Sequence, residues 1–108
     1  MYSYIKGTVK YLGDKYIVLE CNNIGYHIQT STFTISDLQI QDEITMYTHM
    51  VVNDAGIFLY GFSKIEELDM YKLLNKVSSI GPRSALAILS TLSVNQIKLS
   101  IINNDYKS

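Results

Sequence analysis

The sequence lacks most of the features that would place a protein in a membrane or an oxidising compartment. It has one cysteine, one proline and no tryptophan among 108 residues. A single cysteine excludes an internal disulfide, and the strand-like run around Cys21 indicates a buried structural thiol. No apolar run approaches the ~20 residues of a membrane span, and the first residues lack the apolar core of a signal peptide. We therefore expect a cytoplasmic protein that does not associate with membranes.

Positive charge is also scarce. The formal net charge is −1, from nine lysines and arginines against ten acids. A simple DNA-binding domain is usually basic, so any surface for nucleic acid must be local. The apolar content of 47% is sufficient for a hydrophobic core in one or two small domains.

Residues 1–62 have the pattern of short β-strands separated by turns. Turn signals recur at Gly13-Asp14, Asn22-Asn23, Gln41-Asp42 and 53–56. The predicted strands cover 2–12, 16–21, 26–30, 44–52 and 57–62. Gly7 lies inside the first of them and predicts a bulge or a sharp bend. Five short strands with a bent first strand favour a closed OB-type barrel, and a two-sheet sandwich is the alternative.

Residues 63–108 have a helical pattern instead. Ser63 and Glu66 form one predicted capping box, and Ser93 and Gln96 form a second. The predicted helices run from the first box to Val77, over 82–90, and from the second box to about 103–105. Three short helices are too few for an independent core. They must pack on the barrel, on another copy or on a continuation of the chain.

The turn between the first two of these helices carries the clearest chemical signal. Gly81 has no Cβ to hold a ligand away, and Pro82 suits the first helical position because it has no N–H to lose. A helix N-terminus adds a partial positive charge at the same place, and Arg83 adds a cation. This pattern is typical of a helix-hairpin-helix, which grips a nucleic-acid backbone without reading bases. An ordinary corner between two helices is the alternative.

Several segments together resemble the bacterial RuvA family. Ile24-Gly25-Tyr26 corresponds to a strand-leading Val-Gly-Tyr pattern. Residues 47–52 and 59–62 resemble the strands that enter and leave an acidic hairpin, and 81–90 resemble the first helix-hairpin-helix. The resemblance covers the whole chain, and the order and spacing of these segments make it specific.

The resemblance implies a five-stranded OB barrel over 1–62, followed by a partial helix-hairpin-helix domain over 63–108. It implies a homotetramer that holds four-way junction DNA open. It also implies a RuvB-type ATPase, engaged through a C-terminal domain, and a RuvC-type resolvase as partners. The chain ends at Ser108, before the second helix-hairpin-helix and the ATPase-binding domain, so we expect a fragment. Any ATP would be consumed by the partner motor, because no Walker pattern is present and no cofactor is expected on this chain.

The same resemblance selects the candidate site residues. Phosphates would be held by the turn and by cations on the adjacent helix: Lys72, Lys76, Ser79, Ile80, Gly81, Pro82 and Arg83. Ser79 stands where the family usually has glycine, and its hydroxyl is available to a phosphate. Asp54 takes the first of two acidic positions in the hairpin, and Ala55 takes the second. Four copies of Asp54 near a fourfold centre would repel a duplex that crosses it.

Two other function classes remain open at this stage. A generic OB module would stack single-stranded bases on Tyr2, Tyr4, Tyr16, Tyr26 and Tyr47. A repair enzyme would use the helix-hairpin-helix to hold DNA, but it needs a catalytic acid or lysine beyond the hairpin. The stretch 84–92 contains neither. His27 and His49 each stand alone in a strand-like run, which does not indicate a metal site.

Overall fold

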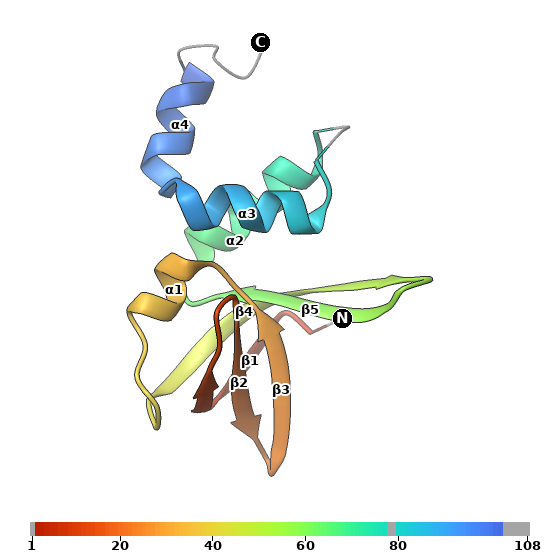
Figure 1. Cartoon of the computed structure of the whole chain (residues 1–108), viewed down its shortest axis with the longest axis vertical. Coiled ribbons are helices and arrows are strands. Elements are labelled where there is room, and N and C mark those ends of the chain that lie inside the picture. Colours follow the sequence, from red (N-terminus) through yellow and green to blue (C-terminus); the bar gives the residue numbers. More distant parts are fainter. Residues whose placement is uncertain (1, 78–79, 103–108) are drawn as a thin grey trace.

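Five strands close into a barrel that the helices cover on one side (Figure 1). The computed structural model describes residues 2–77 and 80–102. The strands are β1 (Tyr4–Leu12), β2 (Tyr16–Cys21), β3 (Ile24–Gln29), β4 (Glu43–Asn53) and β5 (Gly56–Phe62). They pair in the order β1-β2-β3-β5-β4, and β4 closes the barrel by pairing with β1. All pairs are antiparallel except β3 with β5. This confirms the predicted barrel and excludes the sandwich.

Local backbone chemistry explains where the strands turn. Asn22 and Asn23 both have positive φ, 53° and 66°, which gives the tight turn between β2 and β3. β1 changes partner near Gly7: residues up to Thr8 pair with β4, and those from Thr8 onward pair with β2. A Cβ on Gly7 would lie 2.2 Å from the Glu20 carbonyl oxygen, so only glycine permits this approach. The register irregularity itself follows at 9–11.

The helices are α1 (Thr32–Ser36), α2 (Ile65–Asn75), α3 (Pro82–Thr91) and α4 (Val94–Ile102). The second capping box is confirmed: Ser93 N donates to Gln96 Oε1 at 2.8 Å, and Gln96 N donates to Ser93 Oγ at 3.2 Å. The first is wrong, because α2 is capped by Lys64 in extended conformation and without a side-chain bond. The predicted end of α4 at 103–105 lies outside the described residues.

Sequence patterns did not predict α1, a single turn between β3 and β4. Its N-cap is Ser31, whose Oγ accepts from Thr34 N. Glu67 of α2 is buried against it and accepts from Ser31 Oγ at 2.7 Å and from Thr34 Oγ1 at 2.8 Å. These bonds satisfy both carboxylate oxygens and fix α2 to the barrel end.

The core has two parts, one inside the barrel and one between the barrel and the helices. Ile17, Leu19 and Ile28 lie fully buried in the barrel interior. Alternate residues of β5 point the other way, so Tyr60 and Phe62 pack with α2, α3 and α4. The helices thus share their core with β5. This agrees with the expectation that so few short helices cannot form a core of their own. Within the described residues, no helix is long and apolar enough to cross a membrane.

Candidate nucleic-acid interface

The start of α3 has the geometry that a phosphate requires. Gly81 is the N-cap and is exposed, and a Cβ built on it would have no atom within 4 Å. Its φ and ψ of −89° and −179° are extended, so glycine is not required here for the backbone conformation. The bare Cα therefore leaves open space at the helix start, where a ligand can approach the main chain closely.

The helix start also leaves hydrogen-bond donors free of intrahelical partners. Pro82 is at the first helical position, as predicted, and no side chain caps the helix. Ala85 N donates to Gly81 O at 2.9 Å, which leaves the amides of Arg83 and Ser84 without an intrahelical acceptor. The exposed Arg83 side chain adds a full positive charge to the helix dipole. The arrangement favours an anion.

The other predicted phosphate-binding residues lie in different surroundings. Ile80 is half-buried against the helical core, and its N–H already donates to Val77 O at 3.0 Å, so it positions the turn. Ser79 lies outside the described residues. Lys76 is the exposed C-cap of α2. Lys72 lines a separate hollow that includes Tyr4 and Asp69, away from the start of α3.

Asp54 is exposed at the tip of the β4–β5 hairpin, which projects from the barrel in Figure 1. Asn53 pairs with Gly56 across the tip, and its Oδ1 accepts from Ala55 N at 2.8 Å. Gly56 has a φ of +138°, a conformation that glycine adopts without strain. The acid is therefore held on a defined turn at the end of two paired strands.

One groove joins the hairpin to the start of α3. It is lined by Asn53 of β4, Ala55 of the hairpin turn and Tyr60 of β5, and by Gly81 and Arg83 at the start of α3. Its volume is about 540 Å³. The acidic tip and the free helix start therefore lie on the same side of the molecule. Sequence reasoning found both features, but their convergence depends on the packing of α3 on α2, which itself contacts β4 and β5.

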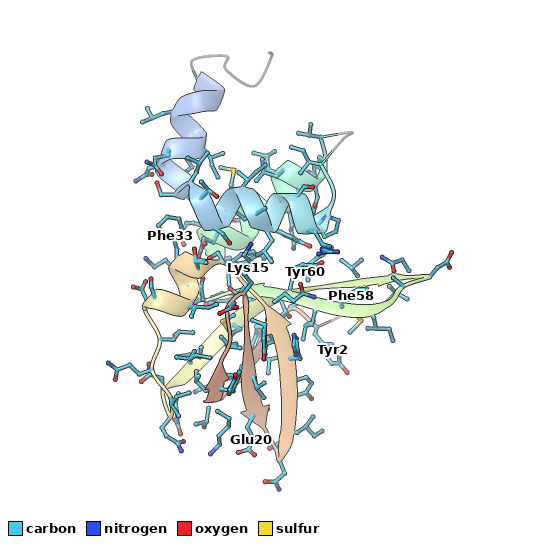
Figure 2. The ribbon with its side chains drawn as sticks, in the orientation of Figure 1. Tyr2, Lys15, Glu20, Phe33, Phe58 and Tyr60 are labelled. Atoms are coloured by element: carbon cyan, nitrogen blue, oxygen red, sulfur yellow. The ribbon has the colours of Figure 1, made fainter. Side chains whose placement is uncertain are left out.

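A second hollow continues this groove toward the barrel end. Gln29, Arg83 and Ser84 line both, and the second adds Lys15, from the loop between β1 and β2. Figure 2 shows Lys15 between the end of the barrel and α3. Sequence reasoning missed Lys15 and Gln29. In the sequence, Lys15 and Gln29 are marked only by their positions beside strand ends. Such positions do not reveal that residues of α3 lie next to them in the fold.

The tyrosines of the single-strand alternative do not form one stacking platform. Tyr16 is stacked on His27 at a centroid distance of 4.2 Å and on Tyr11 at 5.8 Å. Tyr26 meets the edge of Tyr2, and Tyr47 packs against the helical core. Tyr4 is exposed on β1. Most of these rings already contact other rings or the core.

The histidines lie apart on the barrel. His27 is exposed on β3, whereas His49 is half-buried on β4. Burial lowers the pKa of His49, and the nearby charge of Lys72 lowers it further. Cys21 is only half-buried and packs against the barrel core. Across 2–77 and 80–102, no cluster of three His, Cys, Asp or Glu side chains is arranged to hold a metal.

Comparison with known proteins connects this geometry to one family. The family described as RuvA N terminal domain matches residues 1–61. The chain is 42% identical over 108 residues to the Holliday junction branch migration complex subunit RuvA of Clostridium perfringens, with 99% of this chain and 54% of the relative covered. It is 44% identical over 105 residues to the Staphylococcus carnosus protein of the same name, covering 97% and 52%.

A third relative of that name, from Acetivibrio thermocellus, is 38% identical over 109 residues, covering 100% of this chain and 54% of the relative. The chain thus spans about half the length of the curated relatives it matches. The matched barrel, the hairpin and the start of α3 lie in the order that the sequence resemblance required. The chain belongs to the RuvA family.

Proposed function

We propose that the chain binds the backbone of four-way junction DNA and forms the DNA-holding part of a branch-migration complex in recombination and repair. The observation that carries the proposal is the groove that joins the β4–β5 hairpin, whose tip carries Asp54, to the free start of α3. Its Gly81 end attracts phosphates through main-chain amides and Arg83. Asp54 stands at the hairpin tip, between the groove residues Asn53 and Ala55 in sequence but outside the groove lining, and its carboxylate repels phosphates.

The two ends favour a junction over a duplex. In a homotetramer, four copies of Asp54 would meet near the centre while four helix starts hold the arms. A continuous duplex would bring phosphates against the acids, whereas an open junction keeps its strands away from them. The near-neutral net charge fits this role, because a strongly basic protein would hold every duplex tightly.

The proposal also assigns the chemistry that this chain does not perform. ATP hydrolysis belongs to a RuvB-type ATPase, which would join through a region beyond this chain. Strand cleavage belongs to a RuvC-type resolvase. The chain itself acts without a cofactor, as a holder of DNA. Site residues on the groove are Gly81, Pro82 and Arg83, with Lys72, Lys76, Ser79 and Ile80 as further candidates around the turn.

Binding and mass measurements test the proposal together. Labelled four-way junction, linear duplex and single strand of matched length are titrated with the chain at low salt, and light scattering gives the mass of the unliganded protein. We expect tighter binding to the junction and a mass near 49 kDa, from four copies of a 12.3 kDa chain. Equal affinity for junction and duplex in a protein of tetramer mass would contradict the proposal. Preference for single strand would favour the generic OB module.

A further inference from the structure

The groove beside α3 differs from the other hollows of the described surface in its charge. The stretch from the hairpin to the β1–β2 loop is lined by Arg83 and Lys15 and by no carboxylate. Two other hollows carry both signs, one with Asp69 beside Lys72 and one with three acids beside two lysines. In a chain of net charge −1, two cations along one acid-free path form a local positive surface.

Lys15 is held at this place by its main chain. Thr30 N donates to Lys15 O at 3.0 Å, and Gly13 N donates to Tyr16 O at 2.8 Å, so the loop is tied to β3 and closed on itself. The acid next to it in sequence, Asp14, does not line the hollow. Gln29 and Ser84, which both have hydrogen-bonding side chains, line the same hollow as Lys15 and Arg83.

We propose that Lys15 is a further phosphate-binding residue, and that one nucleic-acid strand runs from the start of α3 to the β1–β2 loop. The strand's backbone would contact Gly81 and Arg83 first, pass Ser84 and Gln29, and reach Lys15. Loops between strands 1 and 2 and between strands 4 and 5 are the places where OB barrels generally take oligonucleotides. Here the first loop supplies the attracting cation and the second supplies Asp54. The inference rests on the proposed function and extends its interface onto the barrel.

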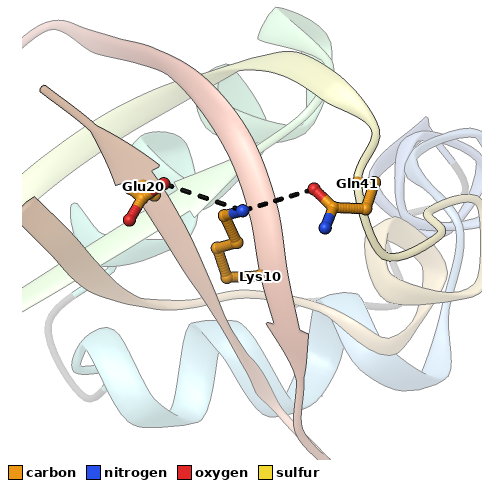
Figure 3. Close-up of polar contacts among 3 residues, drawn as sticks. All are labelled: Lys10, Glu20 and Gln41. Carbon is orange, nitrogen blue, oxygen red and sulfur yellow. Dashed lines mark hydrogen bonds and ion pairs between the residues drawn. The ribbon is translucent and has the colours of Figure 1, made fainter. Parts of the chain in front are cut away.

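Lys10 provides a matched control, since it is another exposed lysine and lies on β1, the strand that leads into the loop carrying Lys15. Its Nζ lies 3.7 Å from Glu20 Oε1 and 3.4 Å from Gln41 Oε1, as Figure 3 shows. Lys10 lines neither hollow of the groove. Replacing either lysine by alanine changes the net charge by the same amount, so a general charge effect acts on both variants.

The experiment measures DNA affinity against salt concentration for the unchanged chain, Lys15→Ala, Arg83→Ala and Lys10→Ala, with a labelled duplex and a labelled junction. Losing one phosphate contact reduces the slope of log affinity against log salt by about 0.9. We expect this reduction in Lys15→Ala and in Arg83→Ala, and twice that reduction in a variant that carries both substitutions. Lys15→Arg should keep the original slope, and Lys10→Ala should leave it unchanged.

The outcomes separate the two proposals. If Arg83→Ala lowers the slope and Lys15→Ala does not, the extended path is wrong and the proposed function stands. If Lys15→Ala and Lys10→Ala have equal effects, Lys15 contributes only general charge, and the path is again wrong. If the unchanged chain binds neither DNA, both proposals are overturned. Thermal unfolding of each variant confirms that the fold is intact.

Discussion

Gly81→Val tests the contact between the start of α3 and a phosphate, because it should affect DNA affinity much more than stability. The position has no neighbour within 4 Å, and its extended backbone suits a β-branched residue, so the variant has room to fold. Valine is a poorer N-cap than glycine, which costs about 0.5–1 kcal/mol of stability. In a domain of this size, that lowers the melting temperature by less than about 8 °C.

The expected effect on DNA is larger. A hydrogen bond from a neutral donor to a charged acceptor contributes about 1.5–3 kcal/mol. The valine side chain would hold a phosphate away from the amides of Arg83 and Ser84 and weaken those bonds. We expect a loss of about 2 kcal/mol, which corresponds to roughly thirtyfold weaker binding.

Fluorescence anisotropy with a labelled duplex arm measures this loss, and thermal unfolding checks the fold in the same buffer. Gly81→Ala is the matched control, because alanine carries a similar capping cost and a smaller side chain. Its affinity should fall between those of the unchanged chain and Gly81→Val. Unchanged affinity in a folded Gly81→Val protein would refute the phosphate-binding role of the helix start.

Three further predictions concern the fold. Glu67→Ala removes the acceptor of two buried hydroxyls and should cost about 2 kcal/mol, lowering the melting temperature by roughly 10 °C, whereas the exposed neighbour variant Glu66→Ala should change it little. Gly7→Ala would place a Cβ 2.2 Å from the Glu20 carbonyl oxygen, so we expect a lower melting temperature and altered β1 amide shifts by NMR; an unchanged melting temperature would mean that the barrel relaxes freely. Burial raises the pKa of Tyr71 from 10.0 to about 12, so this side chain ionises at a lower pH in the unfolded chain than in the folded one. Stability should therefore be full below pH 10 and fall as the pH rises toward 12. Tyr71→Phe should reduce that fall, since burial also raises the pKa of Tyr60, and an identical alkaline profile would contradict the assignment.

The strands were predictable because their signals are local. Asn22-Asn23 and the Asn53–Gly56 turn place the chain reversals where the backbone adopts turn conformations, and the strand-like runs between them match the observed strands closely. The capping box at Ser93 is local in the same way. Such features depend on residues a few positions apart, so the sequence alone is sufficient.

The missed features depend on tertiary packing. The single turn of α1 is stabilised by Glu67, which lies over thirty residues away in sequence. α2 begins one residue later than the Ser63 box indicated, and Glu67 in its first turn is buried against that same turn of α1. Lys15 lines a hollow only because residues of α3 lie beside the loop between β1 and β2. Periodicity and capping patterns carry no information about these distant contacts.

The candidate site likewise has one part that local sequence patterns predict and another that depends on tertiary packing. Gly81, Pro82 and Arg83 could be selected from sequence because a glycine before a helix-starting proline is a local pattern. Their shared groove with the Asp54 hairpin could not, because it forms where the start of α3 lies beside residues of β5. Lys72 seemed equivalent to the turn residues along the chain, yet it faces a different hollow on the far side of the hairpin strands.

The repulsion of duplex DNA by Asp54 is tested most directly by the ratio of junction affinity to duplex affinity before and after Asp54→Asn. The substitution removes the carboxylate and keeps the size of the side chain at an exposed turn. We expect the ratio to fall because duplex binding strengthens at low salt, and we expect the difference to shrink as added salt screens the charge. Weaker binding of both DNAs, or an unchanged ratio in a protein of tetramer mass, would contradict this repulsion.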